Sequence, residues 1–327
     1  MKKNYVLFLL LWAYALQAQE RLQNTLLFGK ADASKILRAY AQPGFEAAGI
    51  ALAEGWHASA RPLHSGKFNF QLAILGGFSD NTTIDLRNLG LQVGQVKPDK
   101  PTTATLMGTS GGVLLLPNSR GGTQELNLLN GSSLPAIPIM ALQFNLGLFR
   151  NTELNFRSGV IPIEQNSIIL GGFGFKHELK QWFPSIALAN FDVSIFGNIS
   201  GMFLNYNLTI DNLPNNPNDQ TWRAQVGTLA LGGIVSKRFA FLTLTTGLQH
   251  LQSIGDMNLE GTYLVGNAPN DPAPMRNPVT ESFSSNNLSF ILGTRLSLGF
   301  LSIQLTGNLG KNSSAGMSFI LGRVQRR

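Results

Sequence analysis

Two short motifs in the sequence resemble enzyme sites, but neither has the surroundings that its chemistry requires. His177-Glu178-Leu179-Lys180-Gln181 begins like the zinc-protease motif H-E-x-x-H, yet glutamine stands where the second histidine ligand should be. Gly108-Thr109-Ser110-Gly111-Gly112 matches the pattern G-x-S-x-G, whose serine must be followed directly by a helix. The residues that follow, 113–116, are typical of a strand. We therefore predict a loop without catalytic function.

Metal and thiol chemistry find equally little support. The four histidines are scattered, at positions 57, 64, 177 and 250, and the chain has no cysteine. A disulfide framework, a thiolate metal site and a cysteine nucleophile are thereby excluded. We predict no catalytic residue, no metal site and no cofactor, and we expect that the protein is not an enzyme.

The composition is unusual for a soluble domain. Only 13% of the 327 residues are charged, whereas an ordinary soluble domain has about 25%. Glycine (35) and phenylalanine (21) are abundant, but the mean hydropathy is only +0.06, which excludes a bundle of membrane-spanning helices. The formal net charge of +7 is not gathered into a dense basic patch, so nucleic-acid binding is a poor interpretation.

Residues 1–18 have the pattern of a secretory signal peptide. Lys2 and Lys3 precede an apolar stretch from Tyr5 to Leu16, and we predict cleavage after Ala18. The alternative is an uncleaved anchor helix, for which the apolar stretch is short. An exported chain without long apolar helices can still cross a membrane as a closed β-barrel, which satisfies its own backbone in lipid.

Apolar and polar residues alternate with period two along many segments. The clearest is the run from Leu288 to Leu298, in which leucine, phenylalanine and threonine interleave with small and polar residues. A soluble β-sandwich also alternates in this way. The polar face here consists mostly of serine, asparagine, glutamine, threonine and glycine, which favours a barrel in lipid over a solvated sheet. We therefore predict an all-β fold, an antiparallel transmembrane β-barrel over residues 64–327.

Loop lengths predict the topology of this barrel. We predict nine strands at 137–149, 152–161, 167–176, 190–206, 221–237, 239–253, 284–297, 300–309 and 314–323. If the long connections 207–220 and 254–283 lie outside the cell, the short turns lie in the periplasm. Residues 64–135 must then hold an odd number of strands, including Phe68–Phe78 and pieces near 102–107 and 113–116. The total is 10, 12 or 14, and we choose about 12.

The segment before the barrel, residues 19–63, has helical spacing. We expect one helix before Pro43-Gly44 and a second from Phe45 to Glu54. An exported chain with such a segment before a barrel suggests a plug or a periplasmic lid. The alternative is a helix packed at the barrel mouth without a gating role. The candidate plug residues are Tyr40, Trp56, His57 and Arg61.

Polar residues on the lumen side of the predicted strands are candidates for a solute path. The charged ones are Arg157, Asp192 and Arg295, and the neutral ones are Gln143 and Gln304. The alternative role of the charged residues is a structural ion-pair network across the lumen.

Two blocks of sequence resemble a known group of proteins. The first comprises Ala39-Tyr40-Ala41-Gln42-Pro43, the run from Gly55 to Pro62 and Gly66-Lys67-Phe68; the second runs from Gly172 to Pro184. They resemble an uncharacterised family of Bacteroidota outer-membrane barrel proteins, known only as a domain of unknown function. The resemblance implies a barrel with N-terminal helices, broadly similar to long-chain fatty-acid transporters, and implies no substrate.

These observations predict a protein of the bacterial outer membrane, surrounded by outer-membrane lipid. The leading hypothesis is passage of small or hydrophobic solutes. The alternative is a non-conducting barrel that acts as a structural anchor or as a component of secretion or surface assembly. A periplasmic partner could dock at 176–184, where Trp182 and Phe183 follow several charged residues; a membrane-interface anchor is the other interpretation of this turn.

Overall fold

The computed structural model describes residues 21–118, 121–163, 166–183, 188–208, 219–267 and 270–322. The predicted signal peptide, residues 1–18, lies outside the described residues. Among the described residues, no helix has both the length and the hydropathy needed to cross a bilayer.

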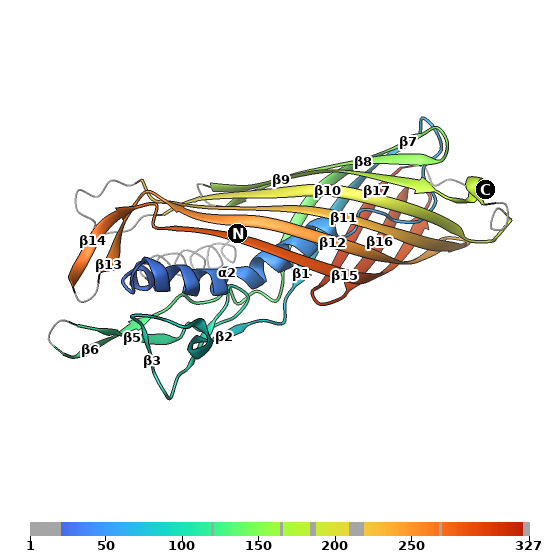
Figure 1. Ribbon diagram of the computed structural model, residues 1–327. Helices are drawn as coiled ribbons and strands as arrows, with labels where there is room; N and C mark the ends of the chain where they lie inside the picture. The colour runs from blue at the N-terminus through green and yellow to red at the C-terminus, as the bar shows by residue number, and fades with distance from the viewer. Residues whose placement is uncertain are drawn as a thin grey trace, which may run out of the picture.

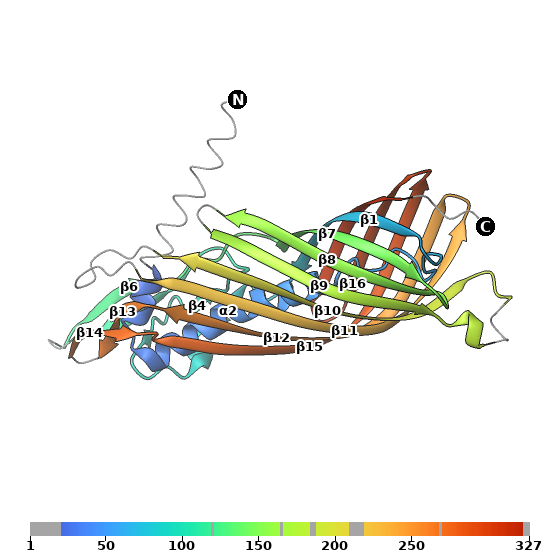
Figure 2. The ribbon, with the colours of Figure 1, turned by 90° about the horizontal axis from the view of Figure 1, so that it is seen from above.

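The centre of the molecule is a closed antiparallel β-barrel of ten strands (Figures 1 and 2). In chain order its strands are β1 (Phe68–Phe78), β7 (Ile137–Leu148), β8 (Thr152–Ile163), β9 (Asn166–Glu178), β10 (Asp192–Asn207), β11 (Thr221–Phe239), β12 (Leu242–Glu260), β15 (Val279–Leu298), β16 (Leu301–Leu309) and β17 (Ser313–Leu321). Each strand pairs with its neighbours, and β1 closes the barrel by pairing with both β7 and β17. The all-β barrel is confirmed, and all nine strands predicted after residue 136 are barrel strands.

Ten strands, the first of the three totals allowed by loop parity, is the observed number, and the choice of 12 was wrong because residues 64–135 supply a single barrel strand, β1. The rest of this region forms small sheets outside the barrel: β2 (Thr83–Asp85) with β4 (Thr102–Ala104), and β3 (Gln95–Val96), β5 (Val113–Pro117) and β6 (Thr123–Asn127). These strands have two to five residues, whereas a transmembrane strand needs about 9–11. They pair with one another and cannot span a bilayer.

The predicted long connection at 254–283 is mostly strand. β12 continues to Glu260, a hairpin of β13 (Thr262–Asn267) and β14 (Asn270–Arg276) follows, and β15 begins at Val279. This hairpin, the small sheets and the end of β10 all lie at one end of the barrel, which we call the long-strand end (Figure 1). The opposite end, with the tight turns, is the short-turn end.

The barrel is apolar outside and polar inside. The period-two alternation alone does not show which of the two faces is the outer one. Outward side chains are strongly exposed, for example Leu142 at 64% and Leu288 at 68%. The inward positions between them carry buried polar residues, among them Gln71, Gln143, Asn145, Asn155, Arg157, Ser194, Ser200, Thr228, Gln249, Ser289, Gln304 and Ser318. A monomeric soluble protein rarely exposes a continuous apolar belt of this kind.

Exposed aromatic residues ring the short-turn end. They stand in or next to the turns between neighbouring barrel strands: Phe149, Trp182, Phe183, Phe239, Phe241 and Phe300. Aromatic rings at this position are typical of the interfacial girdles of transmembrane barrels.

One helix, α2 (Lys30–Ala53), spans the region where we expected two, and residues 21–26 before it are also helical. It continues through Pro43 instead of ending there, although proline removes one helical hydrogen bond. Packing on all sides supports the helix at this point. At Gly44 a side chain would overlap the side chain of Leu106, which belongs to the region outside the barrel. The helix starts among the small sheets and β13–β14 and runs into the barrel (Figures 1 and 2).

Candidate functional site

The lumen is filled by the chain's own N-terminal segment. We call residues 30–63 the plug: helix α2 and the irregular segment Glu54–Leu63 that follows it. At the short-turn end the Leu63 amide donates to Oε2 of Glu153 at 2.8 Å, and the Gly66 amide donates to the Gly147 carbonyl. The plug therefore runs through the barrel from the long-strand end to the short-turn end.

The helical half of the plug packs against apolar wall residues. Phe45 stacks on Phe283 of β15, with ring centroids 4.1 Å apart. Ala48, Ala51 and Leu52 join a buried cluster with wall residues Ala73, Leu75, Ile139 and Ala141. At Gly77 of β1 a side chain would overlap the carbonyl of Ala47, so glycine is required for the helix to approach the wall this closely. This half therefore packs on the wall mainly through apolar contacts.

The irregular half of the plug is held by polar wall side chains. Because it lacks regular structure, its backbone groups need partners from elsewhere. Gln71 donates to the Gly55 carbonyl at 2.9 Å, Gln143 to the Trp56 carbonyl at 2.9 Å and Lys176 to the Ser59 carbonyl at 3.0 Å. Ser194 donates to the Ala60 carbonyl, Thr245 to Ala58 and Gln304 to His57, the last two at 3.4 Å.

Arg157 of β8 holds the end of helix α2. Its Nη1 donates to the carbonyls of Glu54, at 2.9 Å, and Leu52, at 3.4 Å. The last carbonyls of a helix lack helical partners and carry partial negative charge, so a cation here is favourable. Nε and Nη2 donate to Oε1 of Gln143 at 3.0 and 2.7 Å, and the guanidinium lies 4.1 Å from the ring centroid of Trp56.

Trp56 occupies a slot in the wall. A side chain on Gly172 or Gly174 of β9 would come within 3.0 Å of its ring, so these two glycines make room for the indole. Its Nε1 donates to the Leu52 carbonyl at 2.8 Å. The indole is thus fixed between the glycine wall and Arg157.

Two plug carboxylates are bound by the β16–β17 hairpin. Oε2 of Glu54 accepts from Nδ2 of Asn308 at 2.6 Å and from the hydroxyl of Ser314. Oε2 of Glu46 accepts from Nδ2 of Asn312 at 3.0 Å, and its Oε1 lies 3.6 Å from Nζ of Lys311. Both carboxylates are buried, Glu54 almost completely.

Several predicted site residues meet at this interface. Gln143, Arg157 and Gln304 lie on the lumen wall and contact the plug next to Trp56 and His57. The His57 ring packs against Phe196 with a centroid distance of 4.8 Å. The contacts show where these residues lie. Their part in a solute path stays a prediction.

The other predicted residues lie apart from this meeting point. Tyr40 is at the long-strand end, where its hydroxyl donates to the Asn130 carbonyl at 2.7 Å and burial raises its pKa. Asp192 is at the short-turn rim and forms an ion pair with Lys180 at 3.4 Å. Arg61 also lies toward this end, two residues before Leu63. Arg295 faces the lumen from β15 and donates to Ser302 at 3.1 Å.

The buried ion pair of the lumen is Lys176 with Glu153, at 3.1 Å. No ion pair among the described residues joins Arg157, Asp192 and Arg295 to one another. We missed Glu153, Lys176 and Glu54 as site residues. The first two could have been found, since they alternate with outward Leu154 and Phe175. Glu54 could not, because its partners depend on the path of the plug.

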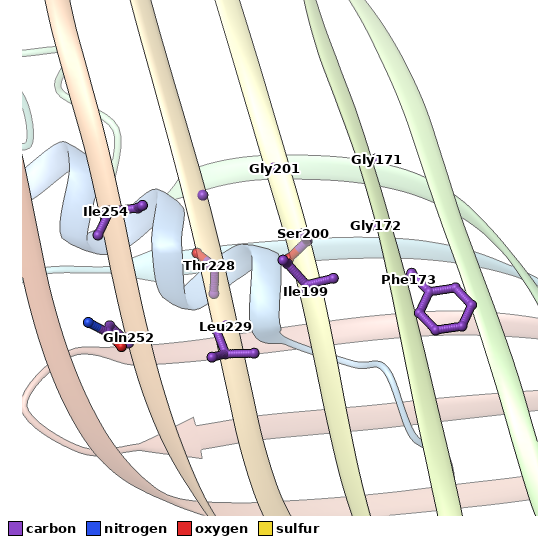
Figure 3. Close-up of a pocket in the computed structure, with 11 residues that line it drawn as sticks. Gly171, Gly172, Phe173, Ile199, Ser200, Gly201, Thr228, Leu229, Gln252 and Ile254 are labelled. Atoms are coloured by element: carbon purple, nitrogen blue, oxygen red, sulfur yellow. The ribbon is translucent and has the colours of Figure 1, made fainter.

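A second concave feature lies on the outer wall (Figure 3). Three glycines, Gly171, Gly201 and Gly227, are neighbours in register across β9, β10 and β11. They form the floor of a shallow apolar groove of about 580 Å³, flanked by Phe173, Ile199, Leu229 and Ile254. An added Cβ at any of the three would meet no atom closer than 3.6 Å, so packing does not require glycine there. Within the described residues, no group of three acidic or histidine side chains could hold a metal ion.

Comparison with known proteins identifies a family and no function. The model of a family described as "Family of unknown function (DUF6588)" matches residues 1–322. No curated protein matches the chain.

Three solved structures illustrate how distant the similarity is. Ail, the attachment invasion locus protein of Yersinia pestis, has 6% identity and a TM-score of 0.28, with 79% of this chain and 98% of that chain covered. The Ralstonia pickettii toluene transporter TbuX has 8% identity and a TM-score of 0.26, with 84% and 94% covered. A Pseudomonas aeruginosa FadL homologue has 10% identity and a TM-score of 0.19, with 86% and 96% covered. At these scores nothing about the function of these proteins is carried over to this chain.

Proposed function

We propose that this chain, which belongs to the DUF6588 family of unknown function, is a plugged outer-membrane barrel that passes solutes when its plug moves. The proposal places the apolar belt in lipid. On β15 the outward positions from Leu288 to Leu298 are ten residues apart, which at about 3.4 Å per residue and a tilt of about 40° spans about 25 Å. This is the height of the apolar band that an outer membrane requires.

The observation that carries the proposal is how the irregular half of the plug is held. Residues 54–63 form hydrogen bonds with side chains of at least six strands, five donating to plug carbonyls and Ser236 accepting from the Ala60 amide, and those side chains are mostly neutral. Each such bond contributes only about 0.5–1.5 kcal/mol, because water can replace it. A segment held in this way can exchange most of its wall contacts for water when it leaves, and its main apolar contacts are those of Trp56 and Ala60.

Two full-length variants test the proposal in planar bilayers. At Gly49 a side chain would overlap the Ser253 hydroxyl and lie 2.9 Å from its Cβ, so Gly49→Leu is a wedge that prevents α2 from seating. We expect it to conduct much more than the unaltered protein. Gly171→Leu is the matched control, since position 171 opens onto the outer groove and its side chain has room.

The absence of cysteine allows the converse experiment. A pair Gly49→Cys with Ser253→Cys needs a shift of only about 1 Å to reach the Cβ separation of a disulfide, about 3.8 Å. Oxidation should lock the plug and abolish current, and a reductant should restore it. If the Gly49→Leu variant carries no current in a correctly assembled barrel, the transport proposal is overturned.

The close apolar packing of α2 on the barrel wall supports the second candidate function, a non-conducting anchor or assembly component. The close contact of Gly77 with Ala47 is typical of a permanent core. In this case neither the Gly49→Leu variant nor the Gly49→Cys, Ser253→Cys pair would carry current, and a partner protein should co-purify with the barrel. The exposed rings of Trp182 and Phe183 at 176–184 are where we propose that a periplasmic partner would bind, and Trp182→Ala should then release it.

A further inference from the structure

We infer that the opened lumen selects small anions. This inference rests on the proposed transport function and names the class of solute. It comes from the charges that the wall presents beside plug residues 52–59, from the partners of those charges and from the charges that leave with the plug.

The short-turn half of the lumen wall carries two arginines that have no carboxylate partner within the described ranges. Arg157, Lys176 and Arg295 point inward there beside Glu153, and the rim adds the carboxylates Glu178 and Asp192 together with Lys180. Lys176 is neutralised by Glu153 at 3.1 Å. Among the described residues neither arginine forms an ion pair.

The partners of the two arginines are neutral. Arg157 is bound by Gln143, two plug carbonyls and the face of Trp56. Arg295 donates to the Ser302 hydroxyl through Nη2, while its Nε is buried and has no hydrogen-bond partner in the described part of the chain. Buried donors are nearly always paired, so an unpaired guanidinium N–H facing a lumen is a site for an acceptor.

The plug also carries charges in the closed state. Glu54 and Glu46 lie in the lumen next to the wall, and Glu46 is 3.6 Å from Lys311. When residues 45–63 leave their seat, these two carboxylates leave together with the cation Arg61, so two minus one gives a net loss of one negative charge. Of the wall carboxylates nearer the ends, Asp192 pairs with Lys180, and Glu281 pairs at 3.6 Å with Arg38, which lies on the plug helix before residue 45. Glu178 at the short-turn rim accepts from Asn151.

Plug departure also frees the donors of Arg157. In the closed state the two carbonyls at the end of α2 occupy Nη1, as oxygen atoms of a carboxylate or phosphate would. A guanidinium presents a planar fork that suits such anions, and arginine-lined pores select them. A small anion that reaches Arg157 would therefore compete with the helix end for the same donors and favour the open state.

Reversal potentials of the full-length Gly49→Leu channel in a KCl gradient test this inference. At about 0.1 M salt, where the Debye length is about 10 Å, we expect a reversal potential whose sign shows that chloride passes more readily than potassium. At about 1 M, where the Debye length is about 3 Å, this preference should be weaker. Arg157→Gln and Arg295→Gln, each in the Gly49→Leu background, should shift the reversal potential toward zero, and the double substitution should abolish the preference. Arg223→Gln is the control, because Arg223 lies on β11 away from the plug, with 55% of its side chain exposed.

The outcomes separate the two proposals. A conducting wedge variant that prefers potassium, or whose chloride preference survives both arginine substitutions, overturns the anion inference and leaves the transport proposal standing. A wedge variant that assembles and carries no current overturns the transport proposal. If Arg157→Gln fails to assemble, Arg295→Gln alone still decides, since the hydrogen bond of Arg295 goes to the wall residue Ser302 and not to the plug.

Discussion

Replacing Arg157 with glutamine should loosen the plug without unfolding the barrel. The guanidinium makes four hydrogen bonds and lies over Trp56 at 4.1 Å. Hydrogen bonds to charged groups contribute about 1.5–3 kcal/mol each, and a desolvated cation–π contact contributes about 2 kcal/mol. Desolvation of the buried guanidinium opposes them by several kcal/mol. Glutamine avoids that penalty but leaves the Glu54 carbonyl without the Arg157 donor, while the Leu52 carbonyl keeps Trp56 Nε1 at 2.8 Å, so we expect a net loss of about 2–4 kcal/mol in the free energy of plug opening.

Native-state hydrogen exchange of the plug amides measures this loss. The amide of Ala60 donates to Ser236 at 2.9 Å and that of Leu63 to Glu153 at 2.8 Å, so both should be protected while the plug is seated. A loss of about 2–4 kcal/mol predicts exchange about 30- to 1,000-fold faster at these amides. Arg223→Gln, which removes an exposed arginine, should change them little. If Arg157→Gln accelerates exchange no more than this control does, the hydrogen bonds of Arg157 to the end of α2 do not hold the plug, and our account of the site is wrong.

Three further substitutions test separate parts of the structure. Lys176→Met leaves Glu153 buried without its partner and should cost about 3–5 kcal/mol of unfolding free energy, whereas the double change with Glu153→Met should recover most of it in a urea titration. Leu142→Arg puts a charge on the proposed lipid face and should cost about 2–4 kcal/mol when folding is measured in vesicles, while a soluble sheet would tolerate it. Asp32→Ala removes the carboxylate that accepts from the amides of residues 92–94 at 2.7–2.9 Å, and limited proteolysis should then cut this loop at least severalfold faster.

The strands after residue 136 were predictable because barrel strands are long and carry their own period. Two faces in contact with different media force alternation over about ten residues, and the parity of the connections then restricts the strand count to even numbers. The strands in the region 79–136 could not be assigned in this way. Its apolar runs, such as 113–116, are as short as those of a soluble sheet, and nothing in them shows whether they join the barrel or pair with one another.

The helix was mispredicted at Pro43 for a similar reason. Proline ends a helix when the chain can turn elsewhere, and the local sequence cannot show that Tyr40, Gly44 and Phe45 will be enclosed by packing partners. Enclosure by Leu106 on one side and Phe283 on the other replaces what the missing hydrogen bond would contribute.

The sequence shows which residues face the lumen. Which contacts they make there depends on the path of the plug. Period-two alternation is enough to place Gln143, Arg157 and Gln304 on the inner face. It could not show that Arg157 binds the end of a helix, because that contact joins residues 103 positions apart and depends on where the plug runs. The same limit explains the charge balance. Alternation places Arg157, Lys176 and Arg295 on the inner wall, but only the path of the plug shows that Glu54 lies near Arg157 and that Glu46 lies near Lys311. Two wall arginines that form no ion pair among the described residues should bind negative charge once the plug has left.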